Sequence, residues 1–280
     1  MKVMKKTFLP VLAVLSCSLA SNAFASARIL IDFQNRTATI RADFNFFCGP
    51  TCNIDDERAT LEQMTEVAQK LWSGDPYLAD DSLKIPLELL YQGYHLQVKA
   101  DLRAKFFSSI EAAHQDALAN QTPVNNYVRI DLENKDFVTA TAGLGANAIH
   151  LLLKRGELDL TSLAHEFGHS MQLDHWQKAV AGPPSIMVER GFPAVDPQYC
   201  YQVAPSKNKK KQAIATVNPR FRRVTQADLW NLREIVNGWP LEKDGDVSHV
   251  DLGWNVAAKD QYLFRPKMKK SFWEKMFGNG

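Results

Sequence analysis

Apolar and polar residues alternate along residues 36–46, which read RTATIRADFNF and include β-branched side chains. This alternation predicts a strand with one buried face. A turn around Gly49 follows. Residues 55–72 then carry apolar side chains at helical spacing, with acidic residues in the first turn, where the helix dipole favours them. Together the two patterns predict a long helix packed on the strand.

Later segments carry shorter versions of the same signals. They predict one further helix, over residues 106–117. They also predict three further strands, over residues 94–102, 127–132 and 143–153. Near the end, Thr225 and Asp228 form a variant of the capping box, which opens a helix that Gly238 and Pro240 terminate. The chain contains no internal repeat.

Residues 1–25 have the three parts of a secretory signal peptide: a lysine-containing start, an apolar run and a small-residue cleavage site of the form Ala-Phe-Ala. We therefore expect a mature chain that begins near Ser26 and is secreted or periplasmic. The apolar run is shorter than the roughly 20 residues of a membrane-spanning helix, and no stable membrane span is expected. One alternative is a lipoprotein processing site at Cys17, which Leu15 fits poorly.

Composition narrows the class of protein. The whole chain has 33 basic and 31 acidic residues, and removal of the signal peptide takes away three lysines, so the mature charge is near zero. This balance gives no reason to expect nucleic acid as a partner. Hydrophobic residues make up 45% and charged residues 23% of the sequence, as in an ordinary globular protein.

Three cysteines follow the signal peptide, and an exported protein can keep a disulfide. Cys48 and Cys52 bracket Gly-Pro-Thr and could close a small loop, although either could pair with Cys200 instead. A structural zinc site would need further ligands nearby that the sequence does not offer. The cysteines are therefore interpreted as loop-stabilising residues.

The segment LAHEFGHSMQLDHW contains the candidate residues for metal binding and catalysis. His165 and His169 are four residues apart, so on a helix both imidazoles project from one side. A catalytic zinc ion takes three protein ligands and leaves a fourth position for water. Glu166 is placed to accept a proton from that water and to pass it to the departing amine. Asp159 and Thr161 are candidate N-caps for this helix.

His175 is the candidate third ligand. On an unbroken helix it would lie about 15 Å along the axis from His165, so the chain must bend back after His169. The pattern HExxHxxxxxH resembles that of the metzincin metalloproteases, and residues 164–175 are closest to the matrixin branch. The resemblance implies zinc ligation by His165, His169 and His175, with a methionine turn beneath the metal, which we assign to Met187.

The resemblance also implies an α+β fold: a metzincin-like zincin domain with a twisted mixed sheet, an active-site helix and a C-terminal lobe that holds the methionine turn. The expected organisation is a signal peptide over residues 1–25, a catalytic domain over residues 26–240 and a C-terminal extension over residues 241–280. An apolar face in the final residues favours docking on the domain, with a membrane surface or a partner as alternatives.

Several positions depart from the metzincin pattern. Gln172 stands where glycine is usual, and a left-handed conformation there would cost about 1–2 kcal/mol. The tyrosine that some relatives carry after the turn methionine is replaced by Val188 and Glu189. Glu189 is also a rival third ligand, but the glycine and proline that follow disfavour the helix this would require. No calcium loop is apparent, and there is no room for an inhibitory propeptide between the cleavage site and the first strand.

The expected function is that of a secreted, monomeric zinc endopeptidase. A protein or peptide substrate would bind along residues 146–152, and the segment between Met187 and Arg223 would shape specificity. The alternative is a metzincin scaffold that holds zinc and binds a partner with little turnover; Glu166 favours the enzyme. Action on peptidoglycan is less favoured because no wall-binding module is recognised. The remaining histidines have no partner at ligand spacing, so no ligand role is predicted for them, although the side chain of His150 could line the cleft. These histidines are His95, His114, His150 and His249.

Overall fold

The fold is given by a computed structural model. It describes residues 25–76, 86–120, 124–133, 140–142, 145–153, 159–176, 182–188, 197–200 and 217–253. The predictions on the signal peptide, Cys17, Glu189 and the C-terminal tail lie outside the described residues. So does most of the segment expected to shape specificity.

A mixed sheet of nine strands forms the centre of the molecule. Its central strand is β2 (Thr37–Cys48), which runs parallel to the longer β4 (Tyr94–Phe107) along one side. On the other side, β2 pairs first with antiparallel β1 (Ala27–Asp32) and then with parallel β5 (Asn126–Asp131). Two groups of strands therefore diverge from one flank of β2.

The sheet extends from these inner strands to three edges. Beyond β5 lie parallel β7 (Ala148–Leu152) and antiparallel β6 (Ala140–Ala142). Beyond β1 lie antiparallel β9 (Val247–Leu252) and β8 (Glu242–Asp244). On the far side of β4, β3 (Glu88–Tyr91) completes a hairpin.

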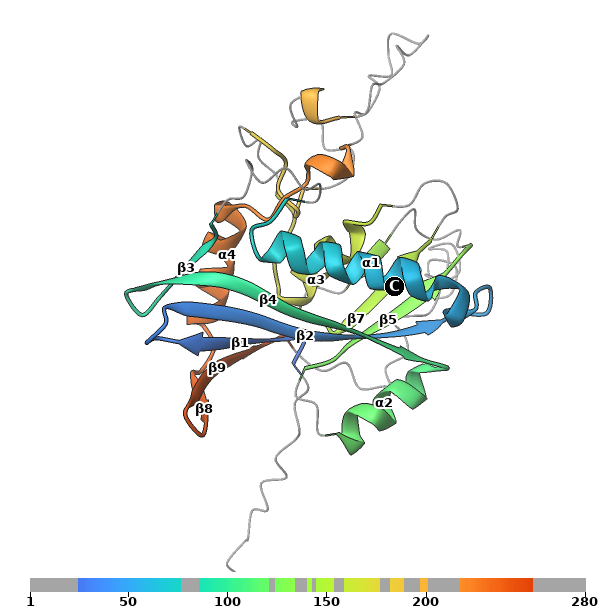
Figure 1. Ribbon diagram of the computed structural model, residues 1–280, viewed down its shortest axis with the longest axis horizontal. Helices are drawn as coiled ribbons and strands as arrows, with labels where there is room; N and C mark the ends of the chain where they lie inside the picture. Colours follow the sequence, from blue (N-terminus) through green and yellow to red (C-terminus); the bar gives the residue numbers. More distant parts are fainter. Residues whose placement is uncertain are drawn as a thin grey trace, which may run out of the picture.

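Helices cover the two faces of the sheet unequally (Figure 1). On one face lie α1 (Ile54–Trp72) and α3 (Ser162–Ser170), and on the other lies α2 (Ile110–Ala119). The fourth helix, α4 (Gln226–Asn237), lies beside β3. Two short 3-10 helices, η2 (Pro197–Tyr199) and η3 (Pro219–Phe221), belong to the C-terminal part. None of the helices in the described ranges is long and apolar enough to cross a membrane.

The main core lies between the sheet and the α1–α3 layer. Phe167 of α3 packs edge-on against Phe44 of β2 and against Trp72 of α1, with ring centroids 5.2 and 5.9 Å apart. The Trp72 indole N–H also donates to the carbonyl of Ala164 at 3.1 Å. These contacts fix the position of α3 on the sheet, and therefore the position of the HExxH segment.

The patterns predicted the regular elements well and their ends less well. The strand at residues 36–46 and the helix at residues 55–72 are confirmed as β2 and α1. The helix expected from residue 106 begins at Ile110 instead, because Ser109 caps it, while residues 106 and 107 continue β4. Five short strands had not been predicted: β1, β3, β6, β8 and β9.

Two differences affect the interpretation of the site. The segment 146–152, expected at the substrate-binding edge, contains β7, which is paired on both sides; the edge strand next to it is β6. Residues 242–252 lie beyond the boundary expected at residue 240, yet they form β8 and β9, and β9 pairs with β1. Short strands of this kind carry too few residues for a recognisable alternation.

Cys48 and Cys52 form a disulfide, with Cα atoms 5.5 Å apart. This is one of the pairings that the sequence allowed. It closes the turn between β2 and α1, where the backbone N–H of Gly49 donates to the Ile130 carbonyl at 2.7 Å.

Candidate metal and catalytic site

The site begins at the N-terminus of α3. The Oδ1 atom of Asp159 accepts hydrogen bonds from the backbone N–H of Thr161 at 2.9 Å and from its hydroxyl at 2.6 Å. Thr161 is therefore the N-cap residue, and Asp159 holds it in place. The side chain of Thr161 itself makes no capping hydrogen bond. Residues 163–170 are all buried, so the polar side chains of this helix are enclosed by protein.

α3 ends in a Schellman motif that turns the chain back. The N–H of Gln172 donates to the His169 carbonyl at 2.9 Å, and the N–H of Leu173 donates to the Gly168 carbonyl at 3.0 Å. Gln172 has φ +73°, so this residue does adopt the left-handed conformation that the sequence left open. The bend brings His175 beside the two histidines of the helix.

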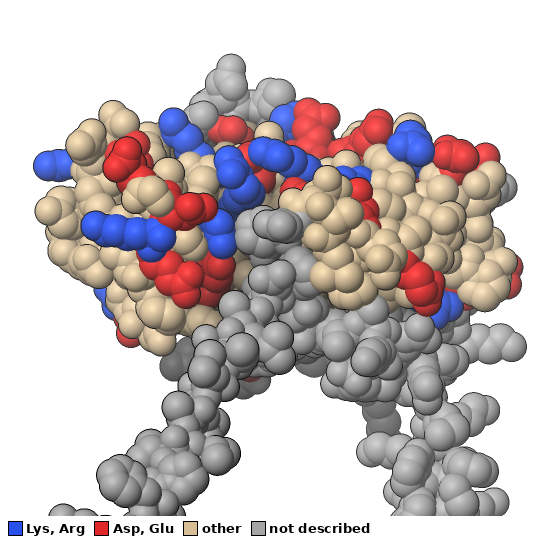
Figure 2. Space-filling model, turned by 90° about the horizontal axis from the view of Figure 1, so that it is seen from below, with Lys and Arg blue, Asp and Glu red and all other residues tan. Residues whose placement is uncertain are grey.

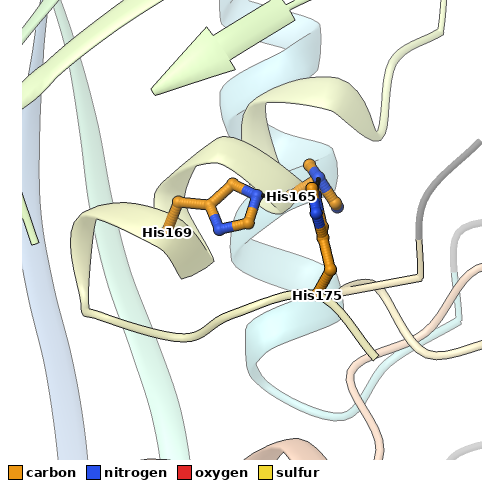
Figure 3. A group of neighbouring side chains, drawn as sticks. All are labelled: His165, His169 and His175. Atoms are coloured by element: carbon orange, nitrogen blue, oxygen red, sulfur yellow. Dashed lines mark hydrogen bonds between the residues drawn. The ribbon is translucent and has the colours of Figure 1, made fainter. Parts of the chain in front are cut away.

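The three histidines converge on one point (Figure 3). The Nε2 atom of His175 lies 3.2 Å from Nε2 of His165 and 3.0 Å from Nε2 of His169. Three imidazole nitrogens this close together could hold a metal ion. The structure thus brings together the three ligands predicted from the sequence.

Backbone carbonyls set the tautomers of the two helix histidines. The Nδ1 atom of His165 lies 2.6 Å from the Ile186 carbonyl, and Nδ1 of His169 lies 2.7 Å from the Leu173 carbonyl. Because a carbonyl only accepts, each Nδ1 must carry the hydrogen, which leaves the Nε2 lone pair for a metal. Burial lowers the pKa of His165 well below its usual range, and the nearby charge of Arg222 acts in the same direction. The neutral imidazole is the form that binds metals.

A tight turn over residues 185–188 lies against α3. The N–H of Val188 donates to the Ser185 carbonyl, and Met187 is 1% exposed. A Cβ atom at Gly168 would overlap the sulfur of Met187, so the turn and the helix are in direct contact at the glycine. Met187 therefore packs against the helix one residue from His169, where the sequence predicted a methionine beneath the ligands.

Asp228 of α4 joins this turn to the third histidine. Its Oδ1 atom accepts from the Ser185 hydroxyl at 2.6 Å and from the Trp176 indole N–H at 2.7 Å. Its Oδ2 atom accepts from the backbone N–H and the hydroxyl of Thr225, which completes the capping box predicted for α4. Trp176 follows His175 directly, and its backbone N–H donates to the Met187 carbonyl at 3.1 Å.

Glu166 is 4% exposed, and in the described part of the chain no group donates a hydrogen bond to its Oε2 atom. Burial raises the pKa of Glu166 to about 8, while the Arg222 guanidinium acts in the opposite direction. Arg222 is itself buried. It pairs with Asp159 at 3.5 Å and donates to the Val188 carbonyl at 3.0 Å.

Some residues of this site were assigned no such role from the sequence. No individual role was predicted for Arg222, and Asp228 was predicted only to cap a helix. The contacts of both residues join segments more than 30 residues apart. His150, for which no ligand role was predicted, is buried and pairs with Asp131 at 2.5 Å in the sheet. Burial lowers the pKa of His150, and the bond to Asp131 opposes that shift.

Comparison with known proteins adds no assignment. No protein-family model matches this chain, and no curated protein resembles it significantly in sequence.

Replacing Gln172 by glycine is expected to stabilise the protein by about 0.5–1 kcal/mol. Relief of the left-handed strain gives about 1–2 kcal/mol, and the greater freedom of glycine in the unfolded chain takes back part of it. Urea denaturation of Gln172→Gly beside Gln172→Ala measures this. The alanine variant keeps the strain and should not be stabilised; equal effects of both variants would contradict the strain argument.

Replacing Gly168 by alanine is expected to destabilise the fold by about 1–3 kcal/mol, because the new methyl group meets the Met187 side chain. The double variant Gly168→Ala/Met187→Ala removes the overlap. In a double-mutant cycle from thermal denaturation, the two changes should therefore cost less together than the sum of the single costs. Additive costs would show that the helix and the turn are not in contact.

Proposed function

We propose that this protein is an exported zinc-dependent endopeptidase of the metzincin type. The observation that carries the proposal is the convergence of three Nε2 atoms, two of them on rings whose Nδ1 hydrogens are directed to backbone carbonyls. The buried Glu166 directly follows the first of these histidines in the helix. A mixed sheet, a short helix carrying HExxH, a sharp return of the chain and a methionine turn also support the family resemblance.

The donor set fits zinc. Three neutral imidazoles are ligands that zinc accepts, and they leave the fourth tetrahedral position for water or substrate. A zinc ion held there would supply Lewis-acid polarisation of a carbonyl and lower the pKa of water. The contribution of the protein itself is to hold the rings of His165 and His169 in one tautomer and to bring the three Nε2 atoms to a common point.

Glu166 is the proposed general base. It would take a proton from the water that attacks the peptide carbonyl and deliver it to the departing amine, so that the peptide C–N bond breaks with no net loss of protons. Its base form must be the carboxylate. Burial disfavours that form, and the guanidinium of Arg222 opposes the effect of burial. Arg222 is neutralised in turn by Asp159.

The substrate would bind as an extended strand along β6. This strand forms the edge beyond β7, and its outer backbone groups lack a partner strand within the described sheet. Just after β6, the N–H of Gly145 donates to the carbonyl of His169 at 2.7 Å, so this edge reaches the metal-binding helix. A peptide added here would lie beside the histidines.

Export is proposed from the residue 1–25 signal, and the Cys48–Cys52 disulfide fits an oxidising compartment. The test of the proposed function is the zinc content of the full chain and its cleavage of a quenched peptide library. Cleavage should be abolished by a chelator and restored by zinc, and His165→Ala should lose both one zinc ion and the cleavage. Zinc at the triad without cleavage of any library would instead indicate a binding module. No zinc at the triad would refute the proposal.

A further inference from the structure

A second group of metal-ligating side chains lies at the opposite end of the sheet. Glu242 is on β8, and His249 and Asp251 are on β9. His249 stands directly opposite Glu242 in the β8–β9 pair, and Asp251 follows two residues later, on the same face of the strand. One ligand atom from each of the three residues lies within 4.8 Å of the others.

The imidazole of His249 is buried without a hydrogen bond. The residue is 4% exposed, and in the described part of the chain neither ring nitrogen has a hydrogen-bond partner. Its Nε2 atom faces Glu242 Oε2 at 3.6 Å and Asp251 Oδ2 at 4.0 Å. These distances are too long for hydrogen bonds. A polar group buried in this way costs free energy unless something else binds it.

Two other charged pairs that join neighbouring strands of the sheet are closer. Figure 2, seen from the α2 side, shows lysine and arginine interspersed with aspartate and glutamate on this face. Arg41 lies 2.9 Å from Asp101, and the exposed His95 lies 3.1 Å from Glu88. In the His249 group, by contrast, the imidazole nitrogen lies 3.6 and 4.0 Å from the two carboxylate oxygens. Ligands held at about 2.0–2.2 Å from one tetrahedral ion are about 3.3–3.6 Å apart, so Glu242 fits and Asp251 needs a shift of a few tenths of an ångström.

Charge favours a cation at the same point. Arg28 on β1 forms a two-pronged ion pair with Asp251, at 2.7 and 2.8 Å. This pair neutralises one of the two carboxylates, and the other, on Glu242, remains negative beside the imidazole. The guanidinium also fixes the orientation of the Asp251 carboxylate, as outer-sphere partners do for metal-ligating carboxylates.

We propose that Glu242, His249 and Asp251 form a second metal site, which takes a divalent transition-metal ion of the zinc class. The site joins β8 to β9 and, through Arg28, to β1, so its role is to stabilise the C-terminal hairpin on the sheet. Nitrogen with two carboxylate oxygens is a donor set that zinc accepts. The inference does not depend on the chemistry at His165, His169 and His175.

Zinc binding by the full chain, stripped with a chelator and followed by calorimetry and by metal content, tests the site. The wild type should bind two ions, and His249→Ala and His165→Ala should each bind one. Glu242→Gln, at a side chain 57% exposed, should keep the fold and weaken the second site about tenfold or more. His95→Ala, which removes a histidine paired with one glutamate on the same sheet, is the control and should bind two.

The outcomes separate the two sites. A wild type that binds one ion, lost in His165→Ala and kept in His249→Ala, would overturn the second site and leave the proposed function standing. Unchanged zinc affinity in both His249→Ala and Glu242→Gln would also overturn it. One ion lost only in His249→Ala would support the second site and refute the triad as a zinc site.

Discussion

Glu166→Gln is expected to lower kcat for peptide hydrolysis by about 10²–10⁴ without changing the zinc content. Glutamine has nearly the same shape as glutamate but cannot accept a proton from the attacking water. The three Nε2 atoms that would bind the metal belong to other residues, and two of their rings are oriented by the Ile186 and Leu173 carbonyls, which the substitution leaves in place.

The measurement is kcat and KM on a peptide selected from the library, together with the metal content of both proteins. Loss in kcat with little change in KM is the result expected for a group that acts only in the transition state. His95→Ala, at an exposed side chain of the β3–β4 hairpin that has no part in the triad, is the control for protein preparation. If Glu166→Gln kept at least a tenth of the wild-type kcat, Glu166 would not be the general base.

Asp228→Ala is expected to destabilise the protein by about 2–5 kcal/mol, because each buried donor left without its acceptor costs about 1–3 kcal/mol, and to weaken zinc binding at the triad. The substitution leaves the Ser185 hydroxyl and the Trp176 indole without their acceptor. Since Ser185 opens the methionine turn and Trp176 follows His175, both the floor of the site and the third ligand lose support. The effect should therefore exceed that of an ordinary helix cap.

Thr225→Ala provides the matched control. It removes a helix cap, which costs about 1 kcal/mol, and keeps the bonds from Asp228 to Ser185 and Trp176. Asp228→Asn keeps an oxygen for these two donors but presents an amide to the N–H of Thr225, so an intermediate loss is expected. Urea denaturation and zinc titration of the three variants measure these effects. Equal losses in Asp228→Ala and Thr225→Ala would mean that Asp228 acts only as a cap.

The pH dependence of stability provides a second test of the role of Asp228. Burial raises the pKa of Asp228, although its hydrogen bonds oppose that shift. A carboxyl group with a raised pKa in the folded state binds its proton more tightly there than in the unfolded chain. The contribution of Asp228 is therefore most favourable at acidic pH, and it is lost as the pH rises through the ordinary aspartate range towards the raised pKa. Asp228→Asn should lack this part of the pH dependence.

Local patterns were sufficient to predict the long elements and to identify the three histidines that could hold a metal ion. β2 and α1 are long enough for periods of two and 3.6 residues to be recognised, and the spacing of His165 and His169 places both rings on one side of any helix. The need for a bend after His169 also followed from local reasoning, because His175 could reach the other two histidines only if the chain turned back. Only the structure shows that Gln172 takes the left-handed conformation in this bend.

The short strands and the residues that surround the histidines could not be predicted in this way, because they depend on contacts between segments far apart in the chain. A strand of three to six residues, such as β6 or β9, owes its existence to the partner strand that binds it. Arg222 and Asp228 became parts of the site only when folding brought the turn at 185–188 against them. For the same reason His249 looked like an ordinary histidine in the sequence, and only the pairing of β8 with β9 placed Glu242 opposite it. The sequence by itself identified the three histidines at residues 165–175 that could hold a metal ion. Packing determined the enclosure, orientation and partners of these side chains, and it alone brought together the second group on β8 and β9.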